Sequence, residues 1–200
     1  MTGDPIQSIR RKMIGALCFG PALLACVQPI AASEQKGSQA AAEGPAPAPT
    51  PAQEIEVLQK IAVVPLTPDQ AVGERHIGKR VRWAGSVYHI SRSDDGACLT
   101  ILYALSGDYA EPRWTLKPTY QSFEACTTGS YDPELVHDST NVTIVGTIAG
   151  ETYIGMGGGG SVGPVVTIEK LFRWSDCLAG DSSPVCKYGF LTPEAPADDQ

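Results

Sequence analysis

Residues 79–105 read KRVRWAGSVYHISRSDDGACLTILYAL. The first part of this stretch alternates, and its apolar or small side chains fall on one face: Val81, Trp83, Gly85 and Val87. Such a period of two predicts a half-buried β-strand, with a kink where the glycine stands. The turn residues Asp94-Asp95-Gly96 separate it from a second apolar run at 98–105, which predicts a β-hairpin.

Further strand patterns lie at 119–126, 141–149 and 165–174, and the second of these places Val142, Ile144 and Ile148 on one face. Two short helical turns are predicted at 67–70 and 132–135, where Thr67 or Asp132 precedes a proline. The sequence therefore predicts a mainly β fold: a small curled antiparallel barrel of OB-like type with one or two short helical turns. An open β-sandwich is the alternative.

The N-terminal residues 1–25 have the pattern of a lipoprotein signal peptide. Arg10, Arg11 and Lys12 precede an uncharged apolar run at 13–25, which is too short to span a bilayer. The run ends in Leu-Leu-Ala before Cys26, the order of a lipobox, so we expect cleavage before Cys26 and lipid on its thiol. An ordinary secretory peptide with an incidental cysteine is the alternative.

The rest of the chain divides by composition. Residues 26–52 contain five prolines and no aromatic residue, which predicts a lipidated cysteine followed by a disordered linker. Residues 53–191 form the β domain, and 192–200 form a disordered acidic tail. Loss of residues 1–25 removes three basic residues and one acid, which changes the net charge from −7 to −9. We therefore expect no nucleic-acid partner, since such binding depends on Lys and Arg.

Four of the six cysteines lie in the β domain: Cys98, Cys126, Cys177 and Cys186. An even number in an exported chain favours disulfides, and three pairings are possible. We favour Cys177 with Cys186, across a short loop, and Cys98 with Cys126. A zinc site is the alternative, but no CxxC spacing supports one, so no metal is expected.

Two catalytic patterns occur in the glycine-rich stretch at 155–163. Gly155, Gly157 and Gly160 fit GxGxxG, and Ser161 fits GxSxG, but both patterns need a strand followed by a helix. A proline and a β-branched run follow instead, so a mobile hairpin loop is predicted. The three histidines have no metal-binding spacing, and His89 is expected on the Val81 face. We predict no enzyme activity and no cofactor.

The aromatic residues suggest one contact site. Trp83 and Trp174 lie in alternating strands, so they are expected in the core. Trp114 lies in the long connection at 106–118, where an exposed indole would suit a partner.

The strand region resembles the Slp family of outer-membrane lipoproteins, named for starvation induction. The resemblance rests on three blocks: GKRVRWAG at 78–85, YDP through VTIVGT at 131–147, and PVV to Trp174 at 164–174. It implies an outer-membrane lipoprotein with a β domain facing the periplasm and no established catalysis. We expect an envelope maintenance or stress role through an envelope protein partner. The alternative is a periplasmic module that binds a small ligand or a peptide.

Overall fold

The computed structural model describes residues 48–115, 120–178, 181 and 183–195, all within the unit Ala46–Gln200. Its helices are α1 (Pro51–Lys60), α2 (Pro68–Ala71) and two 3-10 turns, η1 (Glu74–His76) and η2 (Pro184–Cys186). Its strands are β1 (Arg80–Ser93), β2 (Gly96–Ser106), β3 (Pro112–Arg113), β4 (Ser122–Thr128), β5 (Asn141–Met156), β6 (Gly159–Arg173) and β7 (Gly189–Leu191). Cys26 and residues 1–47 lie outside the described residues, so the predicted signal peptide and lipid site are not part of this description.

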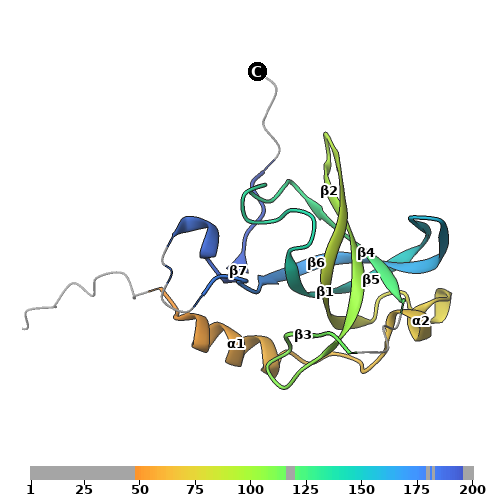
Figure 1. Ribbon diagram of the computed structural model, residues 1–200. Coiled ribbons are helices and arrows are strands. Elements are labelled where there is room, and N and C mark those ends of the chain that lie inside the picture. Colours follow the sequence, from red (N-terminus) through yellow and green to blue (C-terminus); the bar gives the residue numbers. More distant parts are fainter. Residues whose placement is uncertain (1–47, 116–119, 179–180, 182, 196–200) are drawn as a thin grey trace, which may run out of the picture. The chain divides into compact units, whose positions relative to one another are not determined.

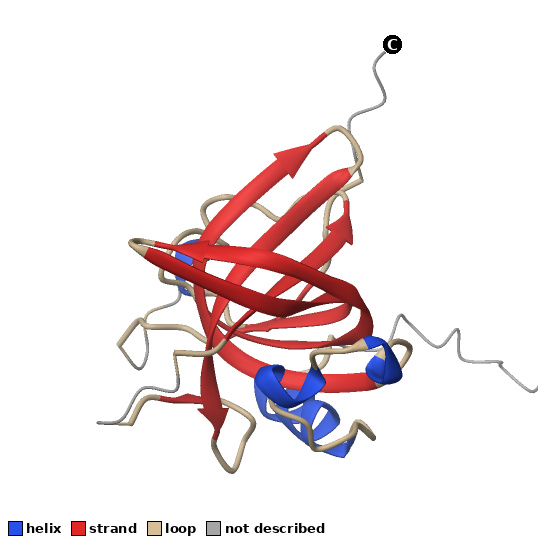
Figure 2. Ribbon diagram, turned by 90° about the vertical axis from the view of Figure 1, so that its right-hand side faces the viewer, coloured by secondary structure: helices blue, strands red, loops and turns tan. Residues whose placement is uncertain are grey.

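Five strands form a closed ring of hydrogen-bonded pairs in the order β1-β5-β6-β4-β2, with β2 pairing back to β1. Figure 2 shows how the strands curl around a common centre. β3 pairs with β2 and β7 pairs with β6, so these two short strands extend the sheet beyond the ring. The prediction of a mainly β, curled, barrel-like sheet with short helices is confirmed. One pairing, β4 with β6, is parallel rather than antiparallel. The reason is topological, since a closed ring with an odd number of strands cannot be antiparallel at every pair.

The main core fills the inside of the ring. Trp83 from β1 meets Phe123 from β4 edge to face, with ring centroids 5.0 Å apart. The inward residues predicted from alternation are buried, from Val81 on β1 to Ile148 on β5. His89 is the exception: it is exposed, because a bulge between Val87 and His89 shifts the alternation by one residue.

A second, smaller core lies between the outer face of the sheet and helix α1. Leu58 of α1 is fully buried and belongs to a cluster with Val145 of β5 and Phe172 of β6. The helix begins at Pro51 after a capping box formed by Thr50, so the last two residues of the predicted linker are helical. Figure 1 shows α1 beside the curled strands. β5 is buried on both faces over its first half.

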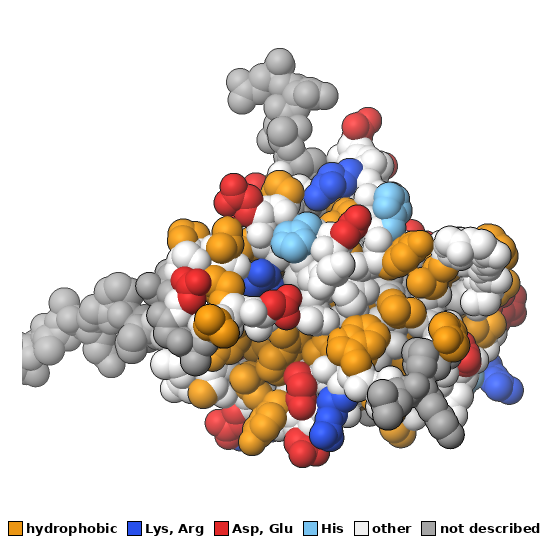
Figure 3. All heavy atoms as spheres, viewed as in Figure 1, with side chains coloured by type: hydrophobic (Ala, Val, Ile, Leu, Met, Phe, Trp, Pro, Cys, Tyr) orange, Lys and Arg blue, Asp and Glu red, His pale blue; other side chains and the backbone are white. Residues whose placement is uncertain are grey.

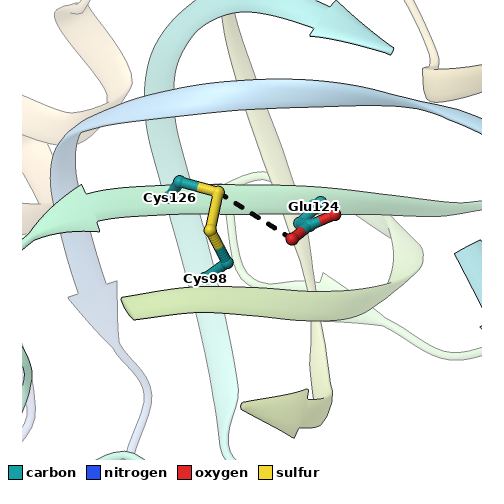
Figure 4. A group of neighbouring side chains, drawn as sticks. All are labelled: Cys98, Glu124 and Cys126. Carbon is teal, nitrogen blue, oxygen red and sulfur yellow. Dashed lines mark hydrogen bonds between the residues drawn. A yellow bond between two sulfur atoms is a disulfide. The ribbon is translucent and has the colours of Figure 1, made fainter. Parts of the chain in front are cut away.

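Both favoured disulfides are present, Cys98–Cys126 and Cys177–Cys186. The first joins directly opposed residues of β2 and β4 (Figure 4), and the Glu124 carboxylate lies 3.9 Å from the sulfur of Cys126. It links two neighbouring strands of the ring covalently.

The C-terminal segment is ordered further than predicted. The backbone of Glu194 exchanges two hydrogen bonds with Ser130, at 2.7 and 3.0 Å, inside the range predicted as a disordered tail. The prediction of a disordered tail is therefore wrong for the first residues after 191. The bridge between Ser130 and Glu194 satisfies backbone N–H and C=O groups that a disordered tail would leave to water. Among the described residues, none of the helices is long and apolar enough to cross a bilayer.

Candidate binding surface

The residues that fit catalytic patterns lie in a β-hairpin. Ser161 is part of β6, opposite Ile154 of β5, and is exposed. Of the glycines of the GxGxxG pattern, Gly155 lies in β5, Gly157 in the turn that follows and Gly160 in β6. Neither pattern therefore opens a helix, so the backbone amides and the helix dipole that these motifs use are not assembled here.

Two clusters of side chains with metal-ligating atoms occur among the described residues, and each contains a disulfide. Cys98 and Cys126 lie with Glu124, and Cys177 and Cys186 lie with Asp181. A sulfur that is bonded to another sulfur cannot act as the thiolate ligand that zinc requires. In this oxidised form, neither cluster is assembled as a thiolate metal site.

The three histidines lie on three different elements. His76 is buried in η1, whereas His89 on β1 and His137 in the turn before β5 are exposed. Burial, followed by the charges of Lys79 and Arg75, lowers the pKa of His76 below its ordinary value of 6.5. A neutral ring is the form this environment favours.

Trp114 follows β3 and half of its surface is exposed, as expected for a contact residue. It shares a shallow depression with Leu105 and Tyr120, which are also exposed. Figure 3 shows hydrophobic side chains gathered over α1, β3 and the adjoining surface on this face of the folded unit. Among the described residues, Trp114 therefore has apolar neighbours at the surface, and the depression that they share is shallow.

The glycine-rich stretch is mostly strand rather than loop. The β5–β6 ladder continues to the pair Met156 and Gly159, so the turn at its tip contains only two residues, Gly157 and Gly158. Gly158 has φ of 105°, a left-handed conformation that suits glycine at a tight turn. The ring of Tyr153 lies over Gly160 from the opposite strand, so it covers backbone that the glycine leaves bare. The predicted hairpin is present, but its strands extend well beyond the predicted ends at 149 and 165.

A groove opens where β4 and β6 separate. The two strands pair from Glu124 and Val165 onward, and the Ser122 carbonyl still lies against Gly163. Toward the hairpin tip they diverge and leave a hollow of about 320 Å³, which we name the hairpin groove. It is lined by Leu102, Tyr120, Ser122, Ile154, Met156, Gly159, Gly160 and Ser161. None of these side chains is charged, in a chain whose net charge is −7.

The hairpin groove lies on the outer face of β2 and β4. Leu102 and Ser122 are opposed on this face, and the Cys98–Cys126 disulfide lies four residues further along the same two strands. In OB-type folds, ligands bind on the face of the second and third ring strands, beside the loop that joins the fourth and fifth. β2 and β4 are the second and third ring strands here, and the β5–β6 turn is that loop. The groove thus occupies the position that this fold type uses for binding.

Two other hollows differ in chemistry. One, of about 450 Å³, is lined by His89, Arg92, His137 and Asp138 among others. The second, of about 400 Å³, lies beside the Cys186 turn and is lined by three acids, Asp132, Glu134 and Asp181. The carboxyl of Asp181 has a lowered pKa because it accepts hydrogen bonds from Ser183. Both are lined in part by exposed charged side chains, whereas the hairpin groove has no charged side chain among its lining residues.

The sequence predicts a contact residue at Trp114, but it does not predict the hairpin groove, which Trp114 does not line. The missed residues on β5, Ile154 and Met156, continue an alternation that begins at Thr152, and this period of two was the available signal. This alternation is hard to recognise in the sequence, because the glycines beside it are typical of a loop.

A family model described as "Outer membrane lipoprotein Slp family" matches residues 46–193. The matched range includes every element from α1 to β7, and so includes the hairpin groove. Searches of curated proteins and of solved structures each found no match.

Proposed function

The chain belongs to the Slp family of outer membrane lipoproteins, and from this premise we propose that it is a non-catalytic binding protein of the cell envelope. Lipid on Cys26 holds it at the outer membrane, and the folded unit faces the periplasm. There it serves envelope maintenance or stress by contacting a partner or ligand at the hairpin groove.

The sequence before the folded unit supports the anchor. Leu-Leu-Ala precedes Cys26 after an apolar run of signal-peptide length. Val27 follows Cys26 in place of an aspartate, which is similar to the outer-membrane sorting pattern that the family resemblance implies. Residues 27–50 would reach about 80 Å if fully extended, enough to carry the domain clear of the lipid headgroups. Two disulfides in the folded unit suit an oxidising compartment.

The observation that carries the binding role is the hairpin groove itself. It is an uncharged hollow with apolar walls and a few polar groups, the hydroxyls of Tyr120, Ser122 and Ser161, and such sites are typical of ligand binding. The non-catalytic role is supported by the residues around Ser161: none of the residues that line the hairpin groove is a His, Asp, Glu or Lys, and a serine nucleophile needs such a base within hydrogen-bond reach.

Metabolic labelling with an acyl chain tests the anchor. We expect the wild-type chain to take up label and to sediment with the outer membrane, and Cys26→Ala to lose both properties. Cys18→Ala is the matched control, because it changes a cysteine within the apolar run and should leave labelling unchanged. Labelled Cys26→Ala protein would refute the lipid site.

A pair of glycine substitutions tests the groove. A side chain at Gly159 meets no atom within 4 Å and shares the groove face with Met156, whereas Gly155 is equally free on the opposite face. Fractionated envelope extract should raise the melting temperature of wild-type protein and of Gly155→Val, but not of Gly159→Val. Equal responses from all three proteins, or none from any, would rule the groove out as the binding site.

A further inference from the structure

We propose that the hairpin groove binds an extended peptide segment, which adds as a strand to the free edge of β6. This inference rests on the proposed function, because it names the class of ligand for the same groove.

β6 has an open edge along the groove. On one side, residues 159–163 pair with β5; on the other side, pairing with β4 covers only Val165 to Thr167. Within the described part of the chain, residues 159–162 make no backbone hydrogen bond outside the β5–β6 ladder. The outward amides and carbonyls of this edge are therefore available to another backbone.

The edge carries none of the usual protection against pairing. Exposed edges are commonly blunted by charged side chains, proline or bulges, but residues 159–162 read Gly-Gly-Ser-Val. At Gly159, the space that a side chain would fill is empty to at least 4 Å. A second backbone can thus approach closely until Pro164, which has no N–H and ends the open edge.

The residues that line the hairpin groove determine which side chains a bound peptide can carry. Leu102, Ile154 and Met156 provide apolar surface beside the edge. Alternate residues of an added strand would point toward them, so those residues should be apolar. Since no lining side chain is charged while the chain is acidic overall, an uncharged segment fits and an acidic one is disfavoured.

The same residues favour a peptide over a sugar. Tyr153 is well exposed, but it lies over Gly160 on the face opposite the groove, so Tyr120 is the one aromatic side chain among the groove residues. A glycan needs a dense set of polar partners, whereas an open strand edge is satisfied by another main chain.

A peptide display library tests this inference on the detergent-solubilised full chain. Random hexapeptides with blocked ends should yield binders with alternating apolar residues. Gly159→Val should weaken their binding at least tenfold, and Gly155→Val should leave it unchanged. Methylation of alternate backbone nitrogens of a selected peptide should also cost at least tenfold. Peptide binding should slow amide hydrogen exchange at residues 159–162.

Three results would contradict the peptide inference. They are a library that yields no binding peptide, peptide binding that Gly159→Val leaves unchanged, and peptide binding that backbone methylation leaves unchanged. If Gly159→Val lowers stability, Ser161→Lys is the second block, because Ser161 lines the groove and is exposed.

A tetramer of N-acetylglucosamine is the competing probe. If it binds and Gly159→Val prevents this, the peptide inference fails while the groove function stands. If concentration-dependent dimers form through this edge instead, the occupant is a second copy and the inference also fails. If neither probe nor envelope extract binds, the proposed function fails with it.

Discussion

Arg173 connects three parts of the chain through one buried side chain. From β6, its Nε donates to the Leu135 carbonyl at 2.6 Å and its Nη1 donates to the Lys187 carbonyl. Only 6% of the residue is exposed. Burial lowers the pKa of the guanidinium, while the nearby Asp176 opposes that shift. The charge persists there because two carbonyls and a carboxylate surround it.

Arg173→Met should lower the free energy of unfolding by about 2–4 kcal/mol, because two carbonyls lose a charged donor. Urea unfolding at pH 7 measures this change. Arg113→Met is the control: Arg113 is exposed, so its replacement should change the free energy by less than about 0.5 kcal/mol. Equal effects of the two substitutions would show that the guanidinium bonds contribute no net stability.

His76 should make the fold sensitive to mild acid. Its ring contacts Arg75 Nε at 2.9 Å and Lys79 Nζ at 3.2 Å, and a protonated ring could accept from neither. Because the pKa of His76 is lower in the folded chain, the unfolded chain binds the proton more readily. The stability from the neutral ring is therefore full above pH 6.5 and is lost as the pH falls through that value toward the folded pKa.

Melting temperatures measured from pH 7.5 to pH 5 test this dependence. The wild-type temperature should fall over this range, and His76→Gln should fall less, since its side chain takes up no proton. His137→Gln, at an exposed histidine, should retain the wild-type slope. An unchanged slope in His76→Gln would assign the acid sensitivity to other groups.

At the scale of elements, β1 closes the ring because it pairs on both edges around Gly85. This residue is opposite Tyr103 of β2 and Val142 of β5 at once. A β-carbon at Gly85 would overlap the carbonyl oxygen of Leu102 and lie 2.6 Å from a methyl carbon of Ile101. The kink that the sequence predicts at Gly85 is thus a place where two backbones approach too closely for a side chain.

Gly85→Ala should lower the free energy of unfolding by about 2 kcal/mol, because the ladder to β2 must shift to admit the methyl group. Gly150→Ala is the matched control on β5, where an added β-carbon meets nothing within 4 Å. It should be neutral within about 0.5 kcal/mol in the same urea titration. A neutral Gly85→Ala would show that the sheet adapts at this point at little cost.

The sequence predicts elements well where side chains alternate between a core and water. Trp83 on β1 and Ile144 on β5 are buried as their period indicates. The prediction fails where geometry departs from that period: the bulge beside His89, and the long β5–β6 hairpin, whose glycines resemble a loop. The groove could not be derived from the sequence, because it depends on where β4 and β6 stop pairing, a contact between residues far apart in the chain.

At the scale of the whole folded unit, helix α1 determines where the domain begins. Composition predicts the boundary between residues 52 and 53, but α1 begins at Pro51, and its Leu58 covers a second core on the outer face of the sheet. Glu54 also accepts a hydrogen bond from the backbone of Phe190 at 3.0 Å, so the first helix and the last strand are joined. The helix is therefore part of the domain rather than an end of the linker.

A chain that begins at Ala46 should unfold with the same free energy as one that begins at Val27, because the unit from Ala46 contains both cores and both disulfides. A chain that begins at Ala62 should be less stable by at least about 3 kcal/mol, since loss of Leu58 alone opens a cavity against Phe172. Urea unfolding of the three chains, with both disulfides verified by mass spectrometry, measures the differences. If the Ala62 chain were as stable as the Ala46 chain, α1 would belong to the linker rather than to the domain, and the linker would be longer than residues 26–50.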